Sequence, residues 1–153
     1  TRDEAKIMLL GVPDKPGVAY AILGKVADAN IDIDMIVQNQ SVDGTTDFSF
    51  TVHRNDFQKV VQIMQTDIVP AVGARQMIPD ENVAKVSIVG IGMRSHAGIA
   101  SLMFKTLADE NINIQMISTS EIKTSVLIQD KYLELAVRAL HKAFDLETKP
   151  EAE

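Results

Sequence analysis

Asp14-Lys15-Pro16-Gly17 joins an apolar run, Lys6–Gly11, to a run with helical spacing that begins at Val18. Proline fixes φ at a value that suits the first turn of a helix, and glycine lets the backbone come close to another group. The four residues therefore predict a strand-to-helix loop with free N–H groups at a helix N-terminus, which suits a small anion such as a carboxylate. A lone Pro-Gly pair is more often a plain turn, so the hypothesis depends on whether the arrangement recurs.

The chain carries a second copy of this arrangement. Three segments of the first half recur in the same order in the second half: residues 5–11 as 84–90, 17–19 as 98–100, and 27–36 as 108–117. The last two pairs share one constant offset, as expected of one structural unit used twice. We therefore expect two units, residues 1–80 and residues 81–153.

Hydrophobic periodicity predicts the order strand, helix, strand, strand, helix, strand in the first unit. The expected elements are a strand at Lys6–Gly11, a helix from Val18 that Asn30 ends, strands at Ile31–Ile36 and Asp47–Val52 joined by a turn at Val42–Thr45, a helix capped by Asn55 or Asp56, a weak strand at Ala74–Ile78 and a linker at Pro79–Asn82. This βαββαβ order is the ferredoxin-like unit, an α+β fold in which both helices cover one face of an antiparallel sheet.

The second unit repeats this order with one expected omission. Its predicted elements are Val83–Ile91, Gly98–Glu110, Ile112–Thr119, Lys123–Gln129 and Lys131–Phe144. The tail, Asp145–Glu153, is charged and contains proline, so we expect the fourth strand to be missing from this chain. A segment outside this chain, or another molecule, would then supply the strand, or the sheet edge would stay open.

Composition excludes several classes of protein. The 153 residues are 46% hydrophobic, but no apolar run approaches the roughly 18 residues that a membrane span needs. The net charge of −6 disfavours a nucleic-acid backbone as a partner. The chain has no cysteine, so it has neither a disulfide scaffold nor a thiolate metal site. A cytoplasmic location is the expectation that fits these features.

The loop and the motifs that follow it carry a family resemblance. The first unit resembles the ACT domain, and the whole chain resembles the tandem-ACT regulatory part, or small regulatory subunit, of aspartate kinase. The motifs that carry the second resemblance are Met35-Ile36-Val37-Gln38-Asn39, Gly44-Thr45-Thr46-Asp47, Lys85-Val86-Ser87-Ile88-Val89-Gly90, Gly92-Met93-Arg94-Ser95-His96 and Ile117-Ser118-Thr119-Ser120-Glu121-Ile122.

The resemblance implies a function without catalysis on this chain. It implies an allosteric module, without a cofactor, that binds L-threonine and L-lysine. These end products would feed back on aspartate kinase, whose separate kinase domain or subunit phosphorylates L-aspartate with ATP at the first step of the pathway. It also implies a homodimer that pairs the first unit of one chain with the second unit of the other. A dimerisation module that needs no ligand is one alternative.

An enzyme is the other alternative, and its candidate residues are few. Asp32 and Asp34 share one face of a predicted strand and could act as a general acid and base, although solvent-facing carboxylates are commoner there. The histidines at 53, 96 and 141 lie too far apart for a metal site. Ser118–Glu121 lacks a His-Asp partner pattern, so binding is its better role.

The repeat predicts two related effector pockets. The first, which the resemblance assigns to threonine, consists of Asp14, Lys15, Pro16, Gly17, Val18, Ala19 and Gln38, with Asn113 and Ile114 from the second unit of the other chain. The second consists of Met93, Ser95, His96, Gly98, Ala100, Ser120 and Glu121, with Asp32, Ile33 and Asp34. Relatives that respond to both effectors can carry a hydroxyl residue where this chain has Ala100.

Charge predicts which amino acid each pocket takes. In the first pocket, the N–H groups of residues 17–19 suit a carboxylate, Asp14 suits an ammonium, and the neutral Gln38 and Asn113 suit a hydroxyl. That combination fits threonine. The second pocket gathers Asp32, Asp34 and Glu121, so a ligand with a positive side chain, lysine, fits better there.

Overall fold

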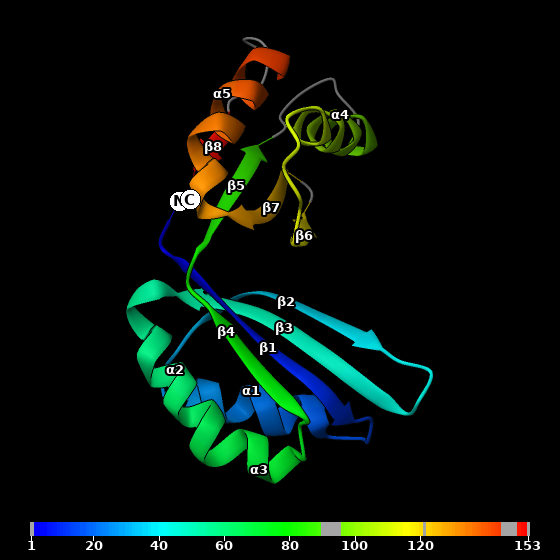
Figure 1. Cartoon of the computed structure of the whole chain (residues 1–153), viewed down its shortest axis with the longest axis vertical. Helices are drawn as coiled ribbons and strands as arrows, with labels where there is room; N and C mark the ends of the chain where they lie inside the picture. Colours follow the sequence, from blue (N-terminus) through cyan, green and yellow to red (C-terminus); the bar gives the residue numbers. More distant parts are fainter. Residues whose placement is uncertain (1, 90–95, 121, 145–149, 153) are drawn as a thin grey trace. The chain divides into compact units, whose positions relative to one another are not determined.

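The computed structural model describes residues 2–89, 96–120, 122–144 and 150–152. It divides the chain into two compact units, Glu4–Glu81 and Asn82–Glu153, the latter together with Thr1–Asp3 (Figure 1).

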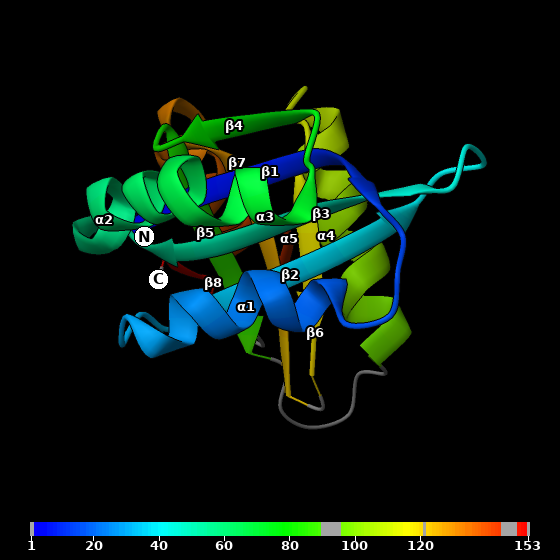
Figure 2. The same ribbon diagram turned by 90° about the horizontal axis from the view of Figure 1, so that it is seen from below.

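The first unit is a four-stranded antiparallel sheet with its helices on one face (Figures 1 and 2). Its elements are β1 (Glu4–Pro13), α1 (Val18–Asp28), β2 (Ile33–Gln40), β3 (Thr45–His53), a 3-10 turn (Arg54–Asp56), α2 (Phe57–Ile63), a π-helical turn (Met64–Ile68), α3 (Val69–Val72) and β4 (Gln76–Asp80). The strand order is β2-β3-β1-β4. The predicted ferredoxin-like order is therefore confirmed.

The core of the first unit lies between the central strands and the helices. Ile7 pairs with Phe50 and Leu9 pairs with Phe48, so these four side chains share one face of the sheet. All four are buried in one hydrophobic cluster, to which the helices contribute Ile22, Val26, Val60, Met64 and Ile68. This face is the one that the alternation of apolar and polar residues in β3 predicts.

The second unit has the same architecture. Its elements are β5 (Val83–Val89), α4 (His96–Asp109), β6 (Met116–Thr119), β7 (Lys123–Gln129), a 3-10 turn (Asp130–Tyr132), α5 (Leu133–Phe144) and β8 (Pro150–Ala152). The strand order β6-β7-β5-β8 matches that of the first unit. A separate core joins β5 and β7 to α4 and α5, and includes Val86, Ile88, Met103, Leu107, Val126, Leu140 and Phe144.

The expectation that the fourth strand is missing was wrong. Residues 150–152 form β8, which pairs antiparallel with residues 86–88 of β5. A three-residue strand is too short to show a hydrophobic alternation, and its proline is tolerated because an edge strand leaves one row of N–H groups outside the ladder. No strand from outside the chain is needed to complete the order.

Two local expectations for the first unit also change. Pro79 and Asp80 are the end of β4, paired with Ile7 and Lys6, so they are not part of a linker. Asp56 stands at the N-cap position of α2, as expected, but its side chain makes no capping hydrogen bond. The 3-10 turn before α2 is capped by His53, whose Nδ1 accepts the N–H of Asn55 at 3.1 Å.

The repeat is visible in the backbone. Asn30 and Asn111 both have a φ of 62°, and each follows the end of its helix, α1 or α4. Asparagine is among the few residues besides glycine that adopt this left-handed conformation readily. The prediction that Asn30 ends its helix is therefore close to the structure, in which α1 ends at Asp28.

Gly11 allows β1 to bulge just before the loop. The β1–β3 register shifts between Leu9 and Val12, and the N–H of Gly11 donates to Asp47 Oδ1 at 2.8 Å. Gly11 has a φ of 65°, and a Cβ there would lie 2.9 Å from the Cβ of Arg75.

We expect Gly11→Ala to destabilise the chain by about 1–2 kcal/mol more than Gly44→Ala. Both glycines have a positive φ, but only at Gly11 would the added Cβ clash with another side chain, that of Arg75. Chemical denaturation of both variants would measure the difference. Equal losses would mean that only the backbone conformation matters at Gly11.

Candidate functional site

The loop between β1 and α1 has the form that its sequence predicts. Gly17 is the N-cap of α1 with a φ of 87°, and the helix begins with the N–H of Ala21 donating to Gly17 O at 3.0 Å. The N–H of Val18 donates to Lys15 O at 3.2 Å. Val18 was expected to offer its N–H to a ligand, but this turn already uses it. The N–H groups of residues 17 and 19 remain the donors proposed for a carboxylate.

Gly17 keeps the approach to these donors open. A Cβ at this position would meet nothing within 4 Å, so the glycine is required by its positive φ and not by close packing. Asp14, Lys15 and Pro16 are also exposed, while Val18 and Ala19 are half-buried at the start of the helix. The loop therefore presents a backbone surface bordered by one carboxylate and one ammonium group.

The loop is fixed to the hairpin formed by β2 and β3. The N–H of Asp14 donates to Gly44 O at 3.0 Å, and the side-chain amide of Gln40 donates to Asp14 Oδ2 at 3.0 Å. Figures 1 and 2 show the loop and the hairpin at the same end of the sheet. The Asp14 carboxylate is thus held by a neutral donor from the end of β2.

Gln40 was missing from the predicted pocket, although the repeat contains a signal for it. At the offset that matches Gly17 with Gly98, Gln40 matches Glu121, which was assigned to the second pocket. Applying the repeat in both directions would have placed Gln40 beside the first loop.

Gln38 lies on the same side of the sheet as the loop and α1. It pairs with Phe48, and Gln40 pairs with Thr46, so both glutamines share the face on which Phe48 is buried. Gln38 is exposed because β2 is an edge strand. The structure therefore brings Gln38, Gln40 and residues 14–19 to one side of the first unit.

Asp32 and Asp34 do not form the regular face that the sequence predicts. Asp32 precedes β2, and Asp34 lies in a bulge, because Ile33 pairs with Val52 whereas Ile36 pairs with Phe50. The N–H of Met35 in this bulge donates to Thr51 Oγ1 at 3.0 Å. Both aspartates are exposed, and Ile33 packs partly against the core.

The tip of the hairpin is pinned by Asp43. Its Oδ1 accepts the hydroxyl of Thr45 at 2.6 Å and the N–H of Thr45 at 3.0 Å. The Thr45 hydroxyl bond is the main reason that the pKa of Asp43 lies below its ordinary value, followed by the Thr45 N–H bond. Because the folded pKa is lowered, the turn is stabilised above the ordinary pKa of an aspartate and loses that support as the pH falls through the folded value.

The structure describes only part of the second predicted pocket. Gly98 and Ala100 lie in α4, and His96 begins that helix. The N–H of Ser120 donates to Lys123 O at 2.8 Å, which closes the β6–β7 connection. Met93, Ser95 and Glu121 lie outside the described residues.

Asn113 and Ile114, predicted to complete the first pocket, follow α4 in the second unit. Asn113 is exposed, whereas Ile114 packs partly against the second core. Their contribution to a pocket with the first unit remains a prediction.

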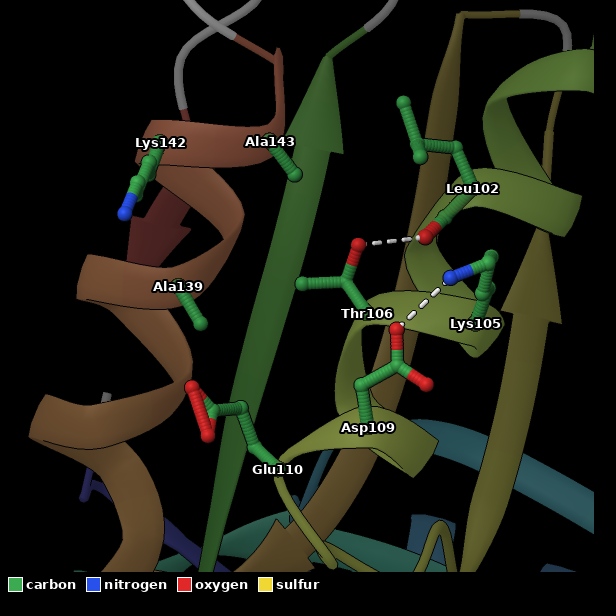
Figure 3. Close-up of a pocket in the computed structure, with 8 residues that line it drawn as sticks. All are labelled: Leu102, Lys105, Thr106, Asp109, Glu110, Ala139, Lys142 and Ala143. Atoms are coloured by element: carbon green, nitrogen blue, oxygen red, sulfur yellow. Dashed lines mark hydrogen bonds and ion pairs between the residues drawn. The ribbon is translucent and has the colours of Figure 1, made fainter.

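A different groove lies between α4 and α5, with a volume of about 430 Å³ (Figure 3). Its lining residues are Leu102, Lys105, Thr106, Asp109, Glu110, Ala139, Lys142 and Ala143. The hydroxyl of Thr106 donates to Leu102 O within the helix, and Lys105 pairs with Asp109 at 2.7 Å. The side chains of this ion pair are 72% and 64% exposed, so it adds little stability. None of these residues belongs to either predicted pocket.

The described residues contain no cluster of three His, Cys, Asp or Glu side chains that could hold a metal ion. His53 acts as a helix cap, and His141 is exposed on α5. Within the same part of the chain, no helix is both long and apolar enough to cross a membrane.

Comparison with known proteins identifies the family. The ACT domain family matches residues 6–67 and, in a second match, residues 86–144. The structure of aspartokinase alpha and beta subunits contains a chain that is 60% identical, with a TM-score of 0.88 and 95% of each chain covered. This chain belongs to the tandem-ACT regulatory chains of aspartate kinase. The regulatory subunit of aspartate kinase from Thermus thermophilus is 36% identical, again with a TM-score of 0.88 and 95% of each chain covered.

Longer relatives show which part of aspartate kinase the chain represents. An aspartate kinase of Stutzerimonas stutzeri is 66% identical over 146 residues, which are 95% of this chain and 35% of that protein. The chain thus spans about a third of the length of such relatives. Since it also matches whole regulatory subunits, it corresponds to the regulatory portion, so no catalytic site is expected on it.

Proposed function

We propose that the chain binds end-product amino acids and thereby restrains an aspartate kinase. The kinase portion, as a domain or a separate subunit, would phosphorylate L-aspartate at the expense of ATP. The observation that carries the proposal is the loop 14–19, where a helix N-terminus and a carboxylate fixed by Gln40 stand side by side. An α-amino acid carries the complementary groups, a carboxylate and an ammonium, bonded to the same carbon atom.

L-Threonine is the ligand proposed for this first pocket. Its carboxylate would accept the N–H groups of Gly17 and Ala19, and its ammonium would bind the Asp14 carboxylate. The Gln38 amide, which lies on the same side of the sheet, would bind the hydroxyl, and Asn113 and Ile114 of a second copy would close the pocket. Once the ligand and the second copy cover the Gln38 amide, an analogue without the hydroxyl would leave that amide unpaired and would bind less tightly.

L-Lysine is proposed for the second pocket. Asp32 and Asp34 are exposed on the first unit and would face the loop before α4 of another copy. A ligand with two ammonium groups would relieve the repulsion between them and Glu121. The structure of E. coli aspartokinase III contains lysine and aspartate, but at 20% identity and a TM-score of 0.63 it supports only the shared fold.

A homodimer is part of the proposal, since each pocket would combine residues from the first unit of one copy with residues from the second unit of the other copy. Sedimentation at tens of micromolar would test it, and a single species of monomer mass would contradict it. A thermal-shift screen of the twenty amino acids separates effector binding from ligand-independent dimerisation. A ligand at 100 times its Kd should add about 2.7 kcal/mol to stability, whereas a pure dimerisation module would show no amino-acid dependence.

We expect Gln38→Ala to weaken threonine binding and leave lysine binding unchanged, because only the first pocket uses this amide. Glu121→Ala should do the reverse. Calorimetric titration of both variants with both amino acids would measure the two effects. Equal losses for both ligands in either variant would mean that the assignment of two separate pockets is wrong.

A further inference from the structure

We propose that Gln40 is a positioning and specificity residue of the first pocket. The inference rests on the proposed function of that pocket. Its amide donates to Asp14 Oδ2 at 3.0 Å, from a strand 26 positions away in the sequence. The contact therefore joins two elements, the β1–α1 loop and β2, at the carboxylate that would bind the ligand's ammonium.

The arrangement leaves Asp14 able to receive a ligand. A carboxylate has two oxygens with about four acceptor positions, so one amide donor at Oδ2 leaves acceptor capacity for an ammonium group. The N–H of Asp14 is also fixed, by Gly44 O at 3.0 Å. The backbone of Asp14 is thus held by the turn of the hairpin, and its side chain by the end of β2. A carboxylate already oriented loses less conformational entropy when the ligand binds.

The neutrality of Gln40 also sets the charge beside Asp14, at the point where the ligand's ammonium would bind. Asp14 and Gln40 together carry one negative charge, which one ammonium balances. At the repeat offset, Gln40 matches Glu121 and Asp14 matches Ser95. In the first unit the acid is therefore on the loop, at Asp14, whereas in the second unit it is at the position that matches Gln40. A glutamate at position 40 would put two carboxylates within hydrogen-bond distance, and would favour a ligand with two positive charges.

A double-mutant cycle tests the positioning role. Calorimetry would measure threonine binding to the wild type, Gln40→Met, Asp14→Asn and the double variant, with Gln58→Met on the exposed face of α2 as the matched control. We expect Gln40→Met to raise the Kd by about 3- to 10-fold, and to add almost nothing once Asp14 is asparagine. Losses that simply add, or an unchanged Kd for Gln40→Met, would overturn the positioning role.

Gln40→Glu tests the specificity role. We expect it to weaken threonine binding and to shift the ratio of threonine to lysine affinity toward lysine by about 10-fold or more. A merely structural role would lower both affinities together and leave the ratio unchanged, which would overturn the proposal.

A ligand-free measurement separates this inference from the proposed function. The side-chain amide signals of Gln40 in a nitrogen-15 spectrum should move in Asp14→Ala, which removes the acceptor, while those of Gln58 stay in place. Unmoved Gln40 signals would refute the contact with Asp14 even if threonine binds. If the signals move but none of the twenty amino acids binds the wild type, the proposed function fails, and the ligand role of Gln40 fails with it.

Discussion

Asp14→Asn should raise the Kd of the first pocket for threonine by about 10- to 100-fold, which corresponds to roughly 1.5–3 kcal/mol for a hydrogen bond to a charged group. The substitution removes the charge that would bind the ligand's ammonium, while the asparagine oxygen still accepts the Gln40 amide. The loop should therefore keep its shape. Calorimetric titration with threonine would measure the loss.

The control for this variant is Asp28→Asn, which removes an exposed charge at the end of α1, away from the loop. It has the same effect on net charge and should leave the Kd unchanged. A similar loss in both variants would point to a general electrostatic effect. An unchanged Kd in Asp14→Asn would mean that the ammonium binds elsewhere, and would contradict the proposed site.

The main elements could be predicted because their signals are local. β3 alternates apolar and polar residues, and Phe48, Phe50 and Val52 are buried where that alternation places them. An asparagine with a positive φ follows each of the helices α1 and α4. Because asparagine is one of the few residues that adopt this conformation readily, the residue type alone indicates where each helix ends. The loop 14–17 was likewise predicted from one proline and one glycine.

The bulges could not be predicted because they depend on the partner strand. Nothing in the apolar sequence around Gly11 shows that its N–H will bind Asp47, which lies 36 positions later. The bulge at Asp34 and Met35 is fixed by a hydroxyl of β3, and it changes which side chains of β2 face the helices. Gln40 is different, because its match to Glu121 in the repeat points to it, whereas its bond to Asp14 depends on β2 lying beside the loop.

Phe50→Ala should destabilise the first unit by about 3–5 kcal/mol, which is the largest effect expected from a single core substitution. Phe50 is fully buried on the central strand β3 and pairs with Ile7 on one side and Ile36 on the other. Removing its ring leaves a cavity that strands on both sides border. Since buried residues of the two described cores belong to different clusters, the second core should keep its stability.

Phe144→Ala is the matched variant, because Phe144 is equally buried in the second core. Hydrogen exchange resolved to single amides would compare the two. We expect Phe50→Ala to speed exchange in β1 and β3 but not in β5 and β7, and Phe144→Ala to do the opposite. Faster exchange in all four strands in either variant would show that the units unfold as one. In Phe50→Ala, saturating threonine should restore part of the protection in β1 and β3, because a ligand held by the loop after β1 stabilises the folded form of the unit that carries it.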